Sequence, residues 1–254
     1  MFYRFCARTD TGRIRSNNED AVAMDAALGL ALLADGMGGC KAGEIASNMA
    51  TSHIQAALGA YLRQSLDQNP CLLSNHSLRQ VLETSVASAN TTILQAARAN
   101  ADYAGMGTTL VVAVFCHGRL LLGHIGDSRC YRYRAGKLLP ITHDHSMVQA
   151  QLDAGWVTPA QARLSQDRNM LTRALGVEDT VQLEVNEFPL QAGDLYLLCS
   201  DGLTDMLLDA TIAKLLASHS ALEQKAQSLI HAANAQGGRD NISVLLAEVV
   251  AVRS

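Results

Sequence analysis

The chain has 254 residues, of which 48% are hydrophobic, and its 20 basic and 24 acidic side chains give a formal net charge of −4. A chain of this length and hydrophobicity can bury a large core, which excludes intrinsic disorder as its main character. The charge balance argues against nucleic acid as the main partner, because proteins that bind it usually carry a concentrated basic surface.

The first ten residues place Arg4 and Arg8 ahead of any apolar run, so we expect no signal peptide. No apolar run approaches the roughly 18 residues that would predict a membrane span. The six cysteines form no C-x-x-C pair, which argues against a zinc ribbon or a redox motif. We therefore expect a cytoplasmic protein with reduced thiols and no membrane partner.

Two long helices are predicted early in the chain, over residues 44–63 and 77–100. In both segments, apolar side chains recur at spacings of three and four with a polar opposite face, which is typical of amphipathic helices. The link between them contains a proline and several turn-forming residues. We expect the two helices to pack against each other in antiparallel orientation.

Strands dominate the rest of the chain, and short turns join several of them, so we expect antiparallel pairing. A helix is predicted over residues 222–235, before the last strand. Residues 144–175 are polar and short-helical and indicate an insertion beside the core, so residues 1–254 are predicted to form a single α+β domain. The predicted strands cover residues 108–116, 119–126, 128–141, 181–188, 194–200 and 241–252.

Acidic residues gather where apolar runs begin or end. Any one of them is explained by ordinary turn chemistry, since Asp-Gly is a common turn pair. A carboxylate at the end of a buried strand is costly unless it is paired or coordinated, and five such places in one chain favour a shared site. The acids concerned are Glu19 and Asp20, Asp35, Asp127, Asp201 and Asp240.

The chemistry of this set predicts a hard divalent cation. All the candidate ligands are oxygen atoms, with no histidine or thiol pair beside them at ligand spacing, which favours Mg²⁺ or Mn²⁺ over zinc or copper. So many carboxylates indicate two ions, an arrangement that suits attack of a metal-activated water on a phosphoryl group. Arg15, four residues before Glu19, is the candidate phosphate clamp. The alternative for Arg15 is a solvated surface arginine.

Eight segments in order resemble the metal-dependent protein phosphatases of type 2C (the PPM family), in particular their bacterial serine/threonine branch. Together they span residues 9–249, so the resemblance covers nearly the whole chain. The segments are TDTGRIRSNNEDA, LLADGMGGCKAGEIAS, GTTLVVAVF, GHIGDSRCYRYRAGKL, THDHSMVQAQLDAGWVT, LTRALG, GDLYLLCSDGLTDML and GGRDNISVLLAEV.

The resemblance implies a four-layer αββα sandwich, in which two antiparallel β-sheets are flanked by pairs of antiparallel helices, with a small flap at about residues 144–175. It also implies a centre of two tightly bound Mn²⁺ or Mg²⁺ ions and a weaker third. By this resemblance Asp35 bridges both tight ions, and Gly36 offers a backbone carbonyl to one of them. Asp201 and Asp240 bind the second tight ion, where Glu19 and Asp20 bind directly or through water. Asp127 and Asp201 hold the third ion, to which Asn169 adds an oxygen, and Arg15 binds phosphate.

The chain departs from the eukaryotic members of that family at Met37. Those members carry at this position a histidine proposed as the general acid, and methionine has no proton to donate. His143 and His145 lie close to the flap in sequence. We interpret them as a turn residue and a helix cap rather than as catalytic groups.

The predicted function is hydrolysis of phosphoserine and phosphothreonine in proteins by a metal-activated water, in which Arg15, Asp35 and Asp201 are the catalytic residues. Phosphorylated proteins and a cognate serine/threonine kinase are the implied partners of what we expect to be a monomer. Two alternatives stay open: a catalytically inactive regulatory or binding domain of the same fold, and a small-molecule phosphomonoesterase. A cysteine-dependent phosphatase is excluded, because no cysteine is followed six residues later by arginine. P-loop and G-x-S-x-G motifs are absent as well.

Overall fold

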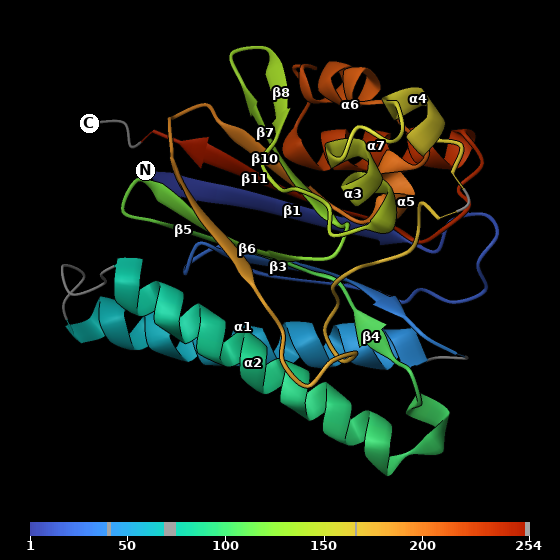
Figure 1. Ribbon diagram of the computed structural model, residues 1–254. Helices are drawn as coiled ribbons and strands as arrows, with labels where there is room; N and C mark the ends of the chain where they lie inside the picture. The colour runs from blue at the N-terminus through green and yellow to red at the C-terminus, as the bar shows by residue number, and fades with distance from the viewer. Residues whose placement is uncertain (40–41, 69–74, 166, 252–254) are drawn as a thin grey trace.

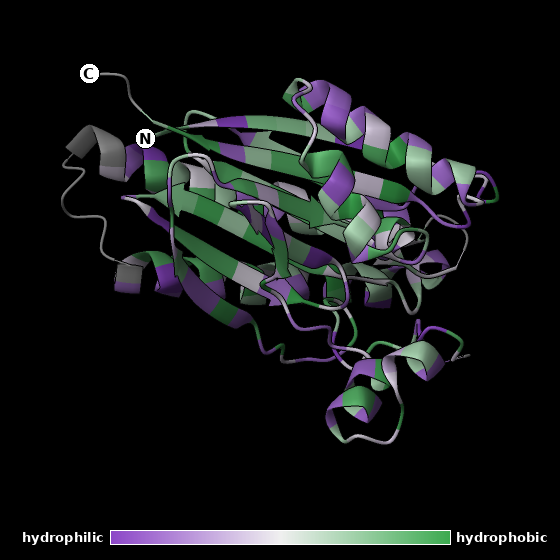
Figure 2. Ribbon diagram, turned by 90° about the horizontal axis from the view of Figure 1, so that it is seen from above, coloured by the Kyte–Doolittle hydropathy of each residue, from purple (hydrophilic) through white to green (hydrophobic). Residues whose placement is uncertain are grey.

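Two antiparallel β-sheets lie face to face at the centre of the protein, and helices cover their outer faces (Figure 1). The computed structural model describes residues 1–39, 42–68, 75–165 and 167–251. The α+β class and the layered sandwich expected from the sequence are therefore confirmed. Strands are the most hydrophobic elements and lie inside, whereas the outer sides of the helices are mixed in hydropathy (Figure 2).

The first sheet contains a strand that the sequence analysis did not anticipate, β1. This strand is an edge strand whose side chains, except that of Cys6, are exposed or only partly buried. It pairs along its whole length with β11, from Phe2 opposite Val250 to Asp10 opposite Ile242. In spatial order the sheet consists of β1 (Phe2–Asp10), β11 (Ile242–Val250), β10 (Leu195–Cys199), β7 (Arg129–Arg134) and β8 (Lys137–Pro140).

The second sheet contains strands that are buried on both faces. In β3, Leu30 and Leu32 face the helices, whereas Ala31 and Leu33 face the other sheet. Burial on both sides explains why this strand is a continuous apolar run in the sequence. In spatial order the sheet consists of β2 (Asp20–Asp25), β3 (Leu30–Met37), β5 (Leu110–Cys116), β6 (Arg119–Ile125) and β9 (Glu184–Pro189), and β4 (Gly107–Thr108) pairs with the end of β3.

Helices α1 and α2 pack on each other and on the second sheet, as their apolar stripes predicted. On the first sheet lie α5, α6 and α7. Among the helices that the structure describes, none is long and apolar enough to cross a lipid bilayer. The bounds are α1 (Ala42–Gln68), α2 (Asn75–Ala99), a 3₁₀ turn (Ala101–Tyr103), α5 (Asp201–Thr204), α6 (Asp209–Leu216) and α7 (Leu222–Ala235).

The flap, which we define as residues 144–175, holds two short helices, α3 (Met147–Asp153) and α4 (Pro159–Ala162). Its two ends are hydrogen-bonded to each other, because Met147 N donates to Met170 O over 2.8 Å and Thr172 N donates to His145 O over 2.9 Å. The flap therefore leaves and rejoins the core at one place, where its two ends are hydrogen-bonded to each other; we call this place the flap root.

Candidate metal centre

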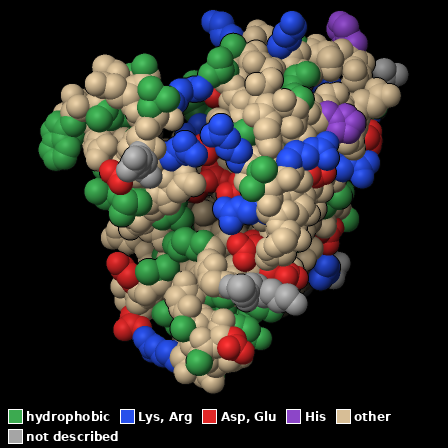
Figure 3. Space-filling model, turned by 90° about the vertical axis from the view of Figure 1, so that its right-hand side faces the viewer, with side chains coloured by type: hydrophobic (Ala, Val, Ile, Leu, Met, Phe, Trp, Pro, Cys, Tyr) green, Lys and Arg blue, Asp and Glu red, His purple; other side chains and the backbone are tan. Residues whose placement is uncertain are grey.

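Acidic residues from both sheets converge on one pocket of about 180 Å³. Asp35 lies near the end of β3, Asp127 follows β6, Asp201 begins α5 directly after β10, and Asp240 precedes β11. Figure 3 shows acidic side chains in a hollow of this face, with basic side chains around them. The pocket is lined by Arg15, Glu19, Asp35, Gly36, Met37, Gly38, Thr109, Asp127, Asn169, Leu171, Asp201 and Asp240.

Two threonines hold the backbone of Asp35. Asp35 N donates to Thr109 Oγ1 over 2.9 Å, and Asp35 O accepts from both Thr108 Oγ1 and Thr109 N over 2.9 Å. These bonds fix the point at which β3 delivers its carboxylate. Sequence reasoning missed both threonines as site residues, because the only local signal was a pair of hydroxyl residues at the start of a strand.

Asp20 lies beneath the pocket rather than in its wall. It is the cross-strand partner of Asp35 and is only 8% exposed. Ser200 Oγ donates to Asp20 Oδ2 over 2.8 Å, whereas Asp20 Oδ1 is buried without a hydrogen-bond partner in the described part of the chain. Burial is the main reason that the pKa of Asp20 rises to about 6. An orphaned carboxylate oxygen here suits a cation or its bound water.

The carboxylates repel one another. Burial, followed by the charges of neighbouring acids, raises the pKa of Asp35 and of Asp201 well above the ordinary range. Burial and the nearby charge of Asp144 raise the pKa of Asp127 to about 7. Divalent cations would remove this repulsion, and a set of oxygen ligands is the set that Mg²⁺ or Mn²⁺ prefers. The residues present therefore fit the ions implied by the sequence.

Gly36 lies where three backbone segments cross. A Cβ atom there would lie 2.1 Å from Gly43 O at the start of α1 and 2.6 Å from Glu19 O. The resemblance implies that Gly36 offers its backbone carbonyl to a metal ion, and the structure adds a packing reason for a glycine at this position. A Cβ on Gly43 would in turn meet the Glu19 carboxyl carbon at 2.9 Å, so Glu19 leans against the beginning of α1.

The loop of residues 11–19 is held by a residue from the far end of the sequence. Asn241 Oδ1 accepts from Glu19 N over 2.8 Å, and Asn241 Nδ2 donates to Thr11 O and Asn17 O over 3.0 and 2.9 Å. Arg15 is exposed, and its Nη2 donates to Asp240 Oδ2 over 2.7 Å. Arg15 is thus placed at the pocket, as predicted. The role of Asn241 was missed, since the pairing of distant loops has no local signature.

One interpretation of the histidines is wrong. Ser146, not His145, caps α3, because Ser146 Oγ accepts from Gln149 N. His145 is buried and contacts Gly126 and Glu184 instead. His143 is exposed and pairs with Asp153 over 2.7 Å. Among the described residues that line the pocket, none is a histidine. Cys40, whose role the sequence did not indicate, lies outside the described residues.

An αββα sandwich with an acidic pocket at the ends of its strands is the arrangement that the resemblance to the metal-dependent phosphatases implied. Residues 12–247 match the family model described as protein phosphatase 2C, and the chain belongs to that family. A serine/threonine phosphatase stp of Listeria innocua is 37% identical over 244 residues, which is 95% of this chain and 94% of that protein.

Solved structures agree with this membership. The crystal structure of the Mycobacterium tuberculosis serine/threonine phosphatase PstP/Ppp has a TM-score of 0.88 and 38% identity, covering 99% of this chain and all of that one. The catalytic domain of PstP in complex with two manganese ions has a TM-score of 0.86 and 38% identity, covering 98% of this chain and 99% of that one. Full-length PstP is longer, since the match covers only 46% of it.

Proposed function

We propose that this protein hydrolyses phosphoserine and phosphothreonine in proteins, with residues 1–254 acting as one catalytic domain that uses Mn²⁺ or Mg²⁺. The observation that carries the proposal is the convergence of carboxylates from the ends of separate strands, together with Arg15, on one pocket. Membership of the protein phosphatase 2C family and the two manganese ions of the PstP structure support it.

The ligand roles follow the geometry of the pocket. Asp35, whose pKa is raised by burial and by the charges of the neighbouring acids, would hold both tight ions, and Gly36, which lines the same pocket, would offer its carbonyl to one of them. When bound, the ions would supply an activated water for attack on phosphorus and would neutralise charge on the phosphoryl group. The proposed ligands of the tight ions are Glu19, Asp20, Asp35, Gly36, Asp201 and Asp240, and those of the weaker third ion are Asp127, Asp201 and Asn169.

The residues of the chain bind and orient the phosphate. Arg15 lines the pocket, and its bond to Asp240 holds the guanidinium at the rim. A planar guanidinium can donate two parallel hydrogen bonds to phosphate oxygens, which would fix the phosphorus relative to the carboxylates. Hydrogen bonding to Asp240 is also the main reason that the pKa of Arg15 is raised, so its charge is permanent at any physiological pH.

Phosphopeptide hydrolysis in the presence and absence of EDTA tests the proposal. Asp35→Asn and Asp201→Asn should each abolish most of the activity, because each removes a charge from the proposed ligand set. Asp179→Asn is the matched control, since its side chain is 79% exposed and pairs with Arg98 at the surface, away from the pocket. Full activity in chelator, or in either centre variant, would contradict the mechanism.

A second test concerns Arg15→Ala. Loss of a hydrogen bond to a charged group costs about 1.5–3 kcal/mol, so the KM for a phosphopeptide should rise roughly 10- to 100-fold. Arg79→Ala, which removes a surface ion pair with Glu83, is the control. An unchanged KM in Arg15→Ala would remove this residue from phosphate binding.

Two alternatives and the cellular setting are settled by further measurements. An inactive binding domain would bind phosphopeptide without releasing phosphate, and a small-molecule phosphomonoesterase would show a higher kcat/KM for phosphorylated metabolites than for phosphopeptides. We propose a monomer in the cytoplasm that opposes a serine/threonine kinase. Sedimentation equilibrium, cell fractionation and phosphoproteomics of a deletion strain test these three statements in turn.

A further inference from the structure

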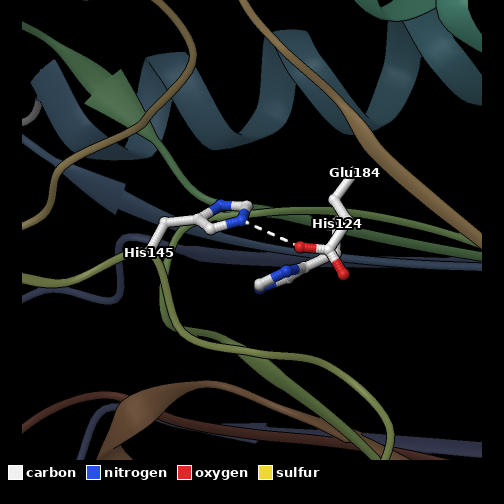
Figure 4. A group of neighbouring side chains, drawn as sticks. All are labelled: His124, His145 and Glu184. Carbon is white, nitrogen blue, oxygen red and sulfur yellow. Dashed lines mark hydrogen bonds and ion pairs between the residues drawn. The ribbon is translucent and has the colours of Figure 1, made fainter. Parts of the chain in front are cut away.

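Two buried histidines lie beneath the turn that carries Asp127. His124 comes from the end of β6, His145 from the root of the flap, and Glu184 from the start of β9. Potential ligand atoms of all three side chains lie within 4.8 Å of one another, and Figure 4 shows the two imidazole rings beside the carboxylate. None of the three lines the pocket. The proposed phosphatase reaction assigns them no role.

His145 is bonded to the turn through both its backbone and its ring. His145 N donates to Gly126 O over 2.8 Å, and Gly126 N donates to His145 Nδ1 over 3.2 Å. Because Nδ1 accepts a hydrogen bond from Gly126 N–H, the neutral ring carries its own proton on Nε2. That nitrogen lies 3.2 Å from Glu184 Oε2 and donates to it. His145 therefore links β9 to the residue just before Asp127.

His124 supports this ring from below. It is 2% exposed, it is the cross-strand partner of Glu184, and its ring centroid lies 4.7 Å from that of His145. Burial lowers the pKa of His124 to about 3, so the ring is neutral. Neither of its nitrogens has a hydrogen-bond partner within the described chain. The side chain serves as a flat packing surface that limits the orientations open to His145.

The hydrogen bonds argue against a transition-metal site in this cluster, although two histidines and a glutamate are suitable ligands for zinc. An ion on His145 Nε2 would require the ring proton on Nδ1, where it would face the N–H of Gly126. The observed arrangement, in which a backbone N–H selects the tautomer, is that of a support for the turn.

A second set of hydrogen bonds joins the flap root to the same turn. The guanidinium of Arg129 donates to the carboxylate of Asp144, from Nε to Oδ1 over 2.9 Å and from Nη2 to Oδ2 over 2.6 Å. The two residues at the flap root, Asp144 and His145, thus bind Arg129 and Gly126, which lie on either side of Asp127 in the sequence. Gly126 has a φ of +100°, and a Cβ there would lie 2.8 Å from the Cβ of Thr109. The turn is consequently held in one conformation from several directions.

We propose that His145 is a positioning residue that fixes the carboxylate of Asp127 for the weaker third cation and thereby couples the root of the flap to that cation. The proposal rests on the proposed function, which assigns Asp127 to that ion. Glu184 and His124 hold the ring of His145, and the ring holds Gly126. A residue of this kind typically changes metal affinity roughly 10- to 100-fold when it is replaced.

Two substitutions separate the bonds of His145. His145→Asn retains an acceptor near the position of Nδ1 and loses the contact with Glu184, whereas His145→Gln retains a donor near Nε2 and loses the acceptor for Gly126. Calorimetric titration of the metal-free proteins with Mn²⁺ measures the affinity of each ion directly. We expect His145→Gln to weaken the weakest ion roughly tenfold, and His145→Asn to remain closer to the parent. The two tight ions should be unaffected.

Asp127→Asn supplies the reference background. If His145 acts through Asp127, His145→Gln should weaken Mn²⁺ binding in the parent and cause no further loss in Asp127→Asn. Equal losses in both backgrounds, or parental binding of all ions by His145→Gln, would overturn the proposal. Should His145→Gln fail to fold, His145→Leu likewise removes the acceptor for Gly126 N–H and should weaken the same ion; parental binding would then be the contrary result.

The remaining outcomes separate this proposal from the function on which it rests. Phosphopeptide hydrolysis by the parent with two tight ions would leave the proposed function intact even if the histidine variants bind Mn²⁺ normally. If Asp35→Asn retained one equivalent of Zn²⁺ and an added His124→Asn abolished it, the cluster would be a metal site and the positioning role would be refuted.

Discussion

Gly36→Ala tests whether the crossing of three backbone segments is as tight as the structure shows. The new Cβ would lie 2.1 Å from Gly43 O, whereas real Cβ contacts below 3.0 Å are essentially never seen. The backbone at residue 36 and that at Gly43 would have to move apart by about 0.9 Å to reach that limit. Overpacking of this kind costs roughly 1–3 kcal/mol, and we expect the upper end because the atoms in the way are backbone atoms.

Gly59→Ala in α1 is the matched control. The nearest atoms to its new Cβ lie 3.6 Å away, which is ordinary contact. Replacing glycine by alanine within a helix stabilises by roughly 0.5–1 kcal/mol. The two substitutions therefore have opposite expected signs, although both add a single methyl group.

Urea unfolding in EDTA measures both effects without any contribution from metal binding. The free energy of unfolding should fall by about 2–3 kcal/mol in Gly36→Ala and rise slightly in Gly59→Ala. A shift of about 1 Å at Glu19 or Asp35 should also lower phosphopeptide kcat on the order of 100-fold. A Gly36→Ala protein with parental stability and activity would refute the reasoning.

Three further predictions concern stability. Burial raises the pKa of Asp127 from 3.8 to about 7, so between these pH values the metal-free folded state binds more protons than the unfolded state. The free energy of unfolding in EDTA should therefore fall as pH rises from about 4 to 7. The fall should be less steep in Asp127→Asn. Asn90 is 1% exposed and its Oδ1 accepts from Gly176 N over 2.7 Å, so Asn90→Ala should lower the free energy of unfolding in urea by roughly 1–3 kcal/mol; parental stability would contradict this. Asp194→Ala leaves the guanidinium of Arg134 without its carboxylate, at 2.5 Å in the parent, and should cost about 3 kcal/mol, measurable as a lower melting temperature.

The sequence predicts much of the fold because burial leaves a local signature. The helix at residues 222–235 has the predicted bounds, and both faces of β3 are apolar because each packs on a separate layer. The convergence of the acids could be predicted as well, since each ends an apolar run. In contrast, β1 was missed because an edge strand whose side chains are exposed or only partly buried has a weak alternation of apolar and polar residues.

The parts of the site that sequence reasoning missed are hydrogen-bond partners from distant segments. Thr109 is 74 residues from Asp35, and Asn241 is 222 residues from Glu19. No local pattern marks a threonine or asparagine whose partner lies in another sheet or loop. His145 was misassigned for a related reason, because a histidine next to a helix start suggests a cap, whereas its contacts with Gly126 and Glu184 depend on tertiary structure.

The pairing of β1 with β11 has a consequence for biosynthesis. Arg15 and Asp240 are 225 residues apart in sequence, and Asn241, which secures the loop of residues 11–19, belongs to the same late segment. During translation the arginine leaves the ribosome long before its partners, and contacts of such high sequence separation also form slowly. A chain that stalls before residue 240 has the early acids but lacks Asp240, which binds Arg15, and Asn241, which holds the loop of residues 11–19. The lining of the pocket is therefore complete only once residues 240 and 241 have been made, and we expect shorter nascent chains to lack the assembled site.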